Sequence, residues 1–590
     1  ARSCGVDVAD LDQMETEKGS WLVYRERKPG EQTVTLIGSI VEAAAASLPI
    51  ERPMRWGASR AEFVRPVHWI VMLMGKDVVP ANLFGLDTGR TSRGHRFMST
   101  GEVSIASPND YEEALEAHKV IASFEKRRAI IQTQLDTIQA AQAANVVPDA
   151  ELLDEVTSLV EWPAALCGEF DPAFLDVPEE ALISAMKSHQ RYFHLRDNAG
   201  KLAPAFIAVA NIDSRNPASV IAGNERVIVP RLSDASFFFR QDSKSTLESK
   251  LERLAHIVFQ GKLGSYFDKA RRVEALAGDI AEMLSDDIDK ARRAGLLCKT
   301  DLVTDMVGEF PELQGIMGGY YARVDGEDDA VADAIAEHYL PVQSGGALPV
   351  TRAGQIIAIA DKLDTLTGLF GIGQPPTGSR DPFALRRQSI GVLRICIECA
   401  LPLDIVALVN LATTRHDRDF DPAPLIEYLF ERLAVSYQEQ GIPVDTFNAV
   451  RYAGEPVTEL TQFDHQVRAL QAFRGHDSAE ALVAANKRVA NILRQADADG
   501  LPGISPALFD SDAESGLHAE VNRVKAGIGP DTSYEAQLAL LAELRPAIDR
   551  YFDDVLVMAE DARVKQNRLA TLADMRALFM GVADVSLLQM

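Results

Sequence analysis

The run Asp301-Leu-Val-Thr-Asp-Met-Val-Gly-Glu-Phe310 decides the fold class of the second half of this chain. Five apolar residues recur along it at the spacing of one helix face: Leu302, Val303, Met306, Val307 and Phe310. Three carboxylates alternate with them at intervals of four residues: Asp301, Asp305 and Glu309. This pattern predicts an amphipathic helix with a solvated acidic face. Because helical periodicity dominates from about Asp242 onward and strand signals nearly vanish there, we expect a long all-α region.

The part of the chain before Asp242 has a mixed pattern. Short apolar or β-rich runs, bounded by Gly, Pro and Asp, predict strands at residues 21–24, 67–73 and 205–210. Between them, residues 111 to about 144 predict a polar helix. We therefore predict an α+β fold, with a mixed α/β front module at residues 1–240 and helical parts at 241–400, 401–480 and 481–590.

Composition limits the classes of function. The 590 residues carry a net charge of −26, which argues against indiscriminate nucleic-acid binding but allows one restricted basic surface. No stretch approaches the roughly 18 uninterrupted apolar residues of a membrane span. Five cysteines in so long a chain form no disulfide framework, which favours a reducing cytoplasm. We expect the Cys396-Ile-Glu-Cys399 pair to pack in a helical core, because a zinc site needs further ligands.

Two short segments combine positive charge with features that suit RNA. Lys187-Ser-His-Gln-Arg-Tyr-Phe193 mixes cationic and aromatic side chains, as a site for an unpaired RNA end does. Pro382-Phe-Ala-Leu-Arg-Arg387 places two guanidinium groups near the positive N-terminus of a predicted helix, which favours phosphate. A surface ion-pair network with the abundant Asp and Glu is an equally good interpretation of the second segment. The candidate RNA contacts here are Lys187, Arg191, Arg386 and Arg387.

A second group of cations lies near the end of the chain, in an otherwise acidic region. It consists of Lys487, Arg488, Arg563, Lys565 and Arg568. Arg563, Lys565 and Arg568 cannot share one narrow stripe at 3.6 residues per turn, but they lie at one end of a predicted helix pair. We hypothesise that these residues form a basic patch that contacts RNA phosphates.

Glu337-His338, followed by Asp361 and Asp364, suggests a metal-dependent phosphohydrolase of the HD type. Such a centre needs several imidazoles and carboxylates around the metal, and His338 is the one histidine between His256 and His416. We therefore predict an HD-like helical scaffold with no metal and no catalytic residue. The glycine-rich run 371–379 lacks the lysine of a phosphate-binding P-loop and is interpreted as a structural loop.

Motifs along nearly the whole chain together resemble the β subunit of bacterial glycyl-tRNA synthetase. They include Met54-Arg-Trp-Gly57, Arg93-Gly-His-Arg-Phe-Met98, Leu159-Val-Glu-Trp-Pro163, Gly223-Asn-Glu-Arg226, Leu313-Gln-Gly-Ile-Met-Gly318, Ala360-Asp-Lys-Leu-Asp364, Asp381-Pro-Phe-Ala-Leu-Arg-Arg387 and Ala485-Asn-Lys-Arg-Val489. No single motif is specific, but their number and order are. The family usually begins with a further N-terminal portion that is missing here, so we expect an N-terminally truncated chain.

The resemblance implies a role for each predicted part. Residues 1–240 would form a B3/B4-type module, 241–400 the HD-like domain, 401–480 a helical linker region and 481–590 an anticodon-binding bundle. Lys187, Arg191, Arg386 and Arg387 would then contact the acceptor side of tRNA(Gly), and the later cations its anticodon side.

The resemblance also implies partners and a reaction. The chain would be the cytoplasmic tRNA-binding subunit of an α2β2 ligase that attaches glycine to tRNA(Gly) with ATP, with no DNA or membrane partner. It would hold no cofactor itself, because ATP and Mg²⁺ are expected on the α subunit. A metal-dependent phosphohydrolase and a non-catalytic scaffold are the alternatives.

Overall fold

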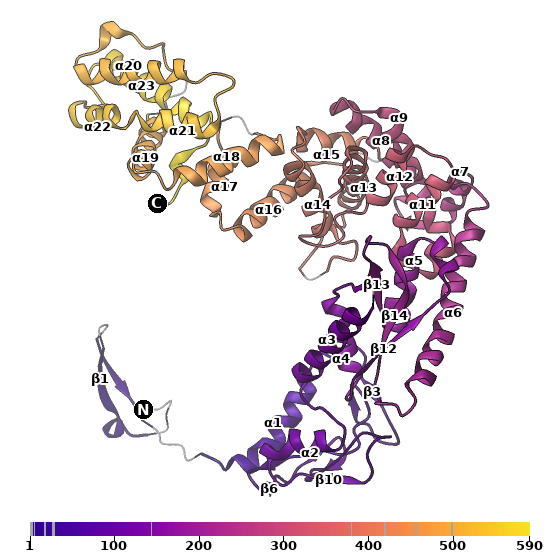
Figure 1. Cartoon of the computed structure of the whole chain (residues 1–590). Coiled ribbons are helices and arrows are strands. Elements are labelled where there is room, and N and C mark those ends of the chain that lie inside the picture. The colour runs from indigo at the N-terminus through magenta and orange to yellow at the C-terminus, as the bar shows by residue number, and fades with distance from the viewer. Residues whose placement is uncertain are drawn as a thin grey trace. The chain divides into compact units, whose positions relative to one another are not determined.

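The computed structural model describes residues 4, 6–16, 19–25, 30–142, 144–378, 380–417, 420–454, 457–496 and 500–590. The chain divides into two compact units, Ala1–Asp234 and Ala235–Met590. Strands concentrate in the first unit and helices make up almost all of the second, which confirms the predicted α+β class (Figure 1). The predicted boundaries within residues 235–590 stay predictions.

A four-stranded antiparallel sheet organises the first unit. Its strand order is β11-β13-β14-β12, with bounds β11 Ala144–Val146, β13 Phe193–Asp197, β14 Leu202–Ala210 and β12 Ala164–Glu169. The apolar residues of β14 explain the predicted strand at 205–210, which is confirmed. Helices α3 (Phe124–Ala141) and α4 (Ala150–Leu159) begin at side-chain caps, Ser123 and Asp149.

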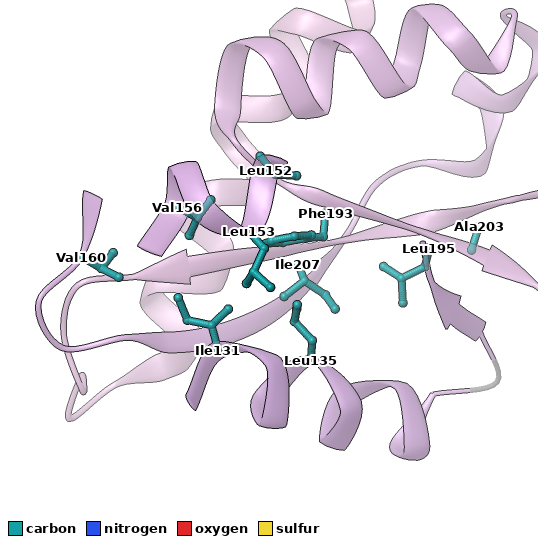
Figure 2. Packing of buried hydrophobic residues seen from close by; sticks show 10 residues of the cluster. All are labelled: Ile131, Leu135, Leu152, Leu153, Val156, Val160, Phe193, Leu195, Ala203 and Ile207. Atoms are coloured by element: carbon teal, nitrogen blue, oxygen red, sulfur yellow. The ribbon is translucent and has the colours of Figure 1, made fainter. Parts of the chain in front are cut away.

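The core of the first unit lies between this sheet and the two helices (Figure 2). Ile131 and Leu135 of α3 and Leu153 of α4 face Phe193 and Ile207 of the strands, and all five are buried. Each such side chain contributes roughly 1.5–3 kcal/mol on burial. This core fixes α4 beside the segment that carries Lys187 and Arg191.

Two-stranded ribbons, several short helices and the longer helices α1 (Thr33–Ser47) and α6 (Pro217–Asp242) complete the first unit. Its two-stranded ribbons pair β1 (Asp12–Thr16) with β2 (Gly19–Val23), β3 (Met54–Arg55) with β4 (Glu62–Phe63), β5 (Leu73–Met74) with β6 (Asp77–Val78), β7 (Asn82–Leu83) with β8 (Leu86–Asp87), and β9 (Thr91–Arg93) with β10 (Glu102–Ser104). The short helices are η1 (Val8–Asp10), η2 (Pro108–Asp110), α2 (Tyr111–Ala117), η3 (Pro172–Asp176), α5 (Glu179–Ser184) and the π-helical turn η4 (Ala185–His189).

Two local predictions for this unit were wrong. The run 67–73 is mostly irregular, and only Leu73 belongs to a strand. The predicted helix at 111–144 is two helices, α2 and α3, because Lys119 adopts a left-handed backbone with φ 64° and interrupts the helix. The strand predicted at 21–24 is present in β2, which ends at Val23.

Helix α13 is the centre of the first part of the second unit. It spans Arg352–Gly371, and 16 of its 20 residues are buried, so neighbours surround it on all sides. The elements around it are α7 (Leu247–Lys250), η5 (Leu251–His256), β15 (Val258–Gln260), β16 (Gly264–Ser265), α8 (Tyr266–Met283), α9 (Ile288–Leu297), η6 (Thr300–Val303), α10 (Asp305–Glu309), η7 (Pro311–Leu313), α11 (Ile316–Val324), α12 (Asp329–Glu337) and α14 (Leu385–Glu398).

The run 301–310 departs from its predicted form. It is not one helix, because the Thr304 hydroxyl caps α10 and separates it from η6. Met306, Val307 and Phe310 are buried as the apolar face predicted. Asp301, however, is buried rather than solvated, and its Oδ2 accepts hydrogen bonds from the Gly315 and Gly318 amides. Burial raises the pKa of this carboxyl to about 6.

Helices continue to the end of the chain. They are α15 (Ile405–Thr413), α16 (Ala423–Glu439), α17 (Val444–Arg451), α18 (Leu460–Phe473), α19 (Ala479–Gln495), η8 (Pro506–Leu508), α20 (Asp512–Gly527), α21 (Tyr534–Ala542), α22 (Arg545–Asp554), α23 (Ala562–Met580) and η9 (Val585–Leu587). Figure 1 shows α19 to α23 gathered in one bundle. The apolar residues at its end are buried: Leu569, Leu572, Phe579 and Val582.

Candidate functional site

Lys187 and Arg191 lie beside helix α4, and each contacts one of its carboxylates. Lys187 pairs with Asp149, the residue that caps α4, and Arg191 Nε lies 2.5 Å from Glu155 Oε1. Burial alone would raise the pKa of Asp149, but its hydrogen bond from Lys187 lowers the value overall. Pairs as exposed as these stabilise a fold only slightly, so phosphate can compete for both cations.

Arg386 and Arg387 occupy the first turn of α14, but they point to different surroundings. The Asp381 carboxylate accepts hydrogen bonds from the Leu385 and Arg386 amides, at 2.7 and 3.0 Å. The positive N-terminus of the helix is therefore already occupied by an anion. Arg386 Nη2 donates to Gly378 O at 2.5 Å, whereas Arg387 lies on the wall of a cavity. Ser379, the last residue of the predicted structural loop, lies outside the described residues.

Lys487 and Arg488 are exposed on α19. Lys487 Nζ donates to the carbonyl of Leu588 at 2.6 Å, and the guanidinium of Arg488 lies 4.1 Å from the ring centre of Phe552 on α22. Neither contact neutralises a positive charge. A guanidinium held on an aromatic face keeps its other face and edges available to a phosphate or a base.

Helix α23 carries three of the predicted cations in two different environments. Arg563 is exposed and Lys565 half-buried in its first turns, and neither has an ion-pair partner in the described ranges. Arg568 is only 11% exposed, and its guanidinium contacts Glu514 Oε1 at 2.6 Å and Asp510 Oδ2 at 3.2 Å. Arg568 therefore joins α23 to α20 inside the bundle.

A cluster of buried charges surrounds the Asp361 carboxylate on α13. Lys299 Nζ lies 2.9 Å from His338 Nε2 and 2.8 Å from Asp361 Oδ2, between the two groups. Lys269 Nζ lies 2.9 Å from Asp361 Oδ1. Burial would raise the pKa of Asp361, but the two ammonium groups together hold it well below its usual range.

The same cluster explains the state of His338. Burial, with the Lys299 charge beside it, lowers the pKa of the imidazole well below its usual value, so the ring is neutral. Its Nδ1 donates to Ile335 O at 2.6 Å, which leaves Nε2 as the acceptor for Lys299. An ammonium group thus lies where an imidazole and a carboxylate would otherwise bind a divalent cation. This donor set does not fit a metal.

A second buried carboxylate, Asp364, lies one turn further along α13. It accepts hydrogen bonds from Lys269 Nζ at 3.0 Å and Arg272 Nε at 2.5 Å. Lys269 also donates to the Thr365 hydroxyl at 2.9 Å. Because Lys269 has carboxylate partners of opposite charge, it can be buried between α8 and α13.

A cavity of about 440 Å³ opens beside this cluster. Its cationic lining comprises Lys269, Lys299, Lys362 and Arg387, and its aromatic lining Phe259, Tyr266, Tyr339 and Phe383. Only Arg387 of these was predicted as a functional residue. The signal for Lys362 was present in the sequence, because it is the one cation in the apolar run 353–372. Nothing in the spacing indicated that Lys269 and Lys299 would meet it.

Comparison with known proteins identifies similar chains. A family model described as "Glycyl-tRNA synthetase beta subunit" matches residues 1–452. A protein of Chromohalobacter salexigens named "Glycine--tRNA ligase beta subunit" is 49% identical over 597 aligned residues, which cover 100% of this chain and 86% of the relative. Proteins of the same name from Ectopseudomonas mendocina and Pseudomonas syringae pv. tomato are 49% and 47% identical, with the same coverage.

Proposed function

The chain belongs to the family of glycyl-tRNA synthetase beta subunits, and on that premise we propose that it supplies the surface that binds and positions tRNA(Gly). The reaction of the family is the attachment of glycine to tRNA. An α subunit is the implied partner, and we propose an α2β2 assembly in the cytoplasm. In this assembly the α subunit binds glycine, ATP and Mg²⁺, and the present chain binds no cofactor and no DNA.

The proposal rests on four cations of the C-terminal bundle that have no carboxylate partner among the described residues: Lys487, Arg488, Arg563 and Lys565. No carboxylate of the described residues forms an ion pair with them, in a chain whose net charge is −26. Helices α19, α22 and α23, which carry these cations and Phe552, belong to one bundle. A local basic surface on an acidic protein attracts RNA phosphates there and repels them elsewhere.

On the acceptor side, the candidates are Lys187, Arg191, Arg386 and Arg387. Arg191 can exchange the exposed Glu155 carboxylate for a phosphate with little loss of stability, whereas the partner of Lys187, Asp149, is half-buried. Binding of this kind contributes to catalysis because correct placement of the tRNA end lowers the barrier without any reacting group on this chain. Arg568 supports the anticodon side indirectly, since its ion pairs hold α23 against α20.

A filter-binding assay with tRNA(Gly), with and without the α subunit, tests the proposal. We expect the chain alone to bind tRNA(Gly), with an affinity that falls steeply as salt rises. A chain that binds the α subunit but not tRNA would be a scaffold, and nucleotide hydrolysis by the chain alone would identify a phosphohydrolase. Either result would contradict the proposal.

A further inference from the structure

The cavity beside Asp361 is positively charged although the chain as a whole is acidic. Four cationic side chains line it, against the two carboxylates Asp361 and Glu312, so it has an excess of two positive charges when all are ionised. Asp361 is already shared between two ammonium groups, those of Lys269 and Lys299. The other wall carboxylate, Glu312, carries one negative charge against the two positive charges of Lys362 and Arg387.

Lys362 and Arg387 are those two cations, and both line the wall, Lys362 as a buried and Arg387 as an exposed side chain. Lys362 Nζ donates to the carbonyls of His338 at 3.1 Å and Leu340 at 2.6 Å, which satisfies two donors but supplies no opposite charge. Arg387 is an exposed lining residue, with no ion-pair partner within the described part of the chain. An ammonium and a guanidinium on one wall bind the oxygens of a phosphate group well.

Packing of α14 on α13 brings these two side chains to the same wall. Gly391 lies one turn after Arg387 on α14, and a methyl group at that position would come within 3.0 Å of the Lys362 Cε atom. The absence of a side chain at Gly391 therefore lets α14 approach the Lys362 stem closely. The helix face that carries Arg387 is thereby directed to the cavity.

The rest of the lining suits a planar aromatic group. Phe259, Tyr266, Tyr339 and Phe383 contribute to the wall. Ammonium groups lie over Phe259 and Tyr339, so Tyr266 and Phe383, both partly uncovered, are the rings for stacking. Stacking on such rings stabilises a base by roughly 1–3 kcal/mol. The volume of about 440 Å³ lies within the roughly 300–1,000 Å³ of small-molecule sites.

We propose that this cavity binds a single nucleotide, with its phosphate at Lys362 and Arg387 and its base against the aromatic wall. A free nucleotide and the terminal nucleotide of an RNA share this chemistry, and both fit the charge and the rings. The proposal does not depend on the bundle cations, and it rests on the proposed function only where the occupant is the RNA end, since Arg387 is also an acceptor-side candidate.

Calorimetric titration of the full chain with AMP tests this proposal. We expect one site per chain. Adenosine and inorganic phosphate should each bind at least about tenfold more weakly, because adenosine lacks the phosphate contacts and phosphate lacks the base stacking. Arg387→Ala should weaken AMP binding about tenfold or more. Lys290→Ala, which removes one exposed positive charge of the same unit away from the cavity, is the matched control and should leave it unchanged.

Phe383→Ala provides a second variant that leaves the charge intact. It should weaken AMP binding and leave phosphate binding as in the parent chain. Thermal unfolding of each variant shows whether it is folded. Absence of AMP binding to the folded parent chain at millimolar concentration, or equal binding by parent and Arg387→Ala, would overturn the proposal.

Competition distinguishes the two sources of the ligand. If tRNA(Gly) displaces AMP and tRNA lacking its terminal adenosine does not, the RNA end is the natural occupant. If AMP binds and neither RNA displaces it, the occupant is a free nucleotide. Filter binding of tRNA, measured separately, reports on the proposed function alone, so the two proposals can fail independently.

Discussion

Two groups of surface cations in this protein differ in what surrounds them. Lys187 and Arg191, beside α4, each contact a carboxylate, whereas Arg563 and Lys565, at the start of α23, have no such partner among the described residues. In this chain 86 acidic side chains outnumber 60 Lys and Arg, and the net charge is −26. Exposed cations without a partner are therefore better indicators of an RNA surface than positive charge alone.

The largest effect on stability is expected at Arg568. This residue lies on the same helix as Arg563, but, like Lys187 and Arg191, it forms ion pairs with carboxylates. Arg568→Ala should lower the free energy of unfolding of the C-terminal bundle by about 3 kcal/mol, because it leaves the buried Glu514 carboxylate without its partner. Urea unfolding measures this change. The matched variant Arg563→Ala should change it by less than about 0.5 kcal/mol. Equal, small changes would show that Arg568 has no structural role.

The next effect concerns the buried Lys362, whose ammonium contacts carbonyls but no carboxylate. Burial lowers its pKa from the ordinary 10.5 to about 7, against the attraction of Asp361 and together with the repulsion of Lys299, Lys269 and Arg387. Between pH 7 and 10.5 the unfolded chain holds this proton and the folded chain does not, so stability rises with pH in that window.

Lys362→Met removes this titration. The free energy of unfolding should therefore increase more for the parent chain than for the variant between pH 7 and 9.5. Urea unfolding at both pH values measures the difference, and groups common to both chains cancel. Identical pH dependence would mean that Lys362 keeps its proton throughout the window.

Charge reversal at the unpaired cations tests the comparison directly. Arg563→Glu combined with Lys565→Glu should weaken binding of tRNA(Gly) at least about tenfold, since two phosphate contacts become repulsive. The matched control is Arg523→Glu combined with Lys525→Glu, which makes the same change of net charge on α20 at cations that are already paired. Equal losses of affinity in filter binding would mean that only overall charge matters.

The smallest effect is expected at the paired cations of the first unit. Lys187→Ala combined with Arg191→Ala should weaken tRNA binding only about twofold, because each phosphate contact replaces an existing ion pair. The same filter-binding assay measures it. A loss as large as that for Arg563 and Lys565 would show that pairing in the unbound chain does not predict RNA contact.

The sequence predicted the fold class because hydrophobic periodicity changes near Asp242 and secondary structure follows that periodicity. It failed where one residue interrupts a pattern, as the left-handed backbone of Lys119 divides the helix predicted at 111–144. It also placed Asp301 on a solvated face, because periodicity alone could not show that the Gly315 and Gly318 amides donate hydrogen bonds to this carboxylate in the core.

The candidate site was less predictable than the fold. Asp361 and His338 could be singled out from residue types, but the ammonium group of Lys299 between them comes from the turn between α9 and η6, 39 residues before His338. Positive charge alone likewise predicted the same role for Arg568 and Arg563. In the structure Arg568 pairs with two carboxylates, and Arg563 has no such pair among the described residues. Residue type identifies a cation, whereas its partners depend on tertiary packing.

The salt dependence of tRNA(Gly) binding tests the central claim most directly. A variant with alanine at Lys487, Arg488, Arg563 and Lys565 should bind tRNA(Gly) with a logarithmic salt slope that is shallower by about 3 than that of the parent chain, since each phosphate contact contributes about 0.7–0.9. A folded variant with the slope of the parent would contradict the account, because the tRNA would then be bound by a different surface.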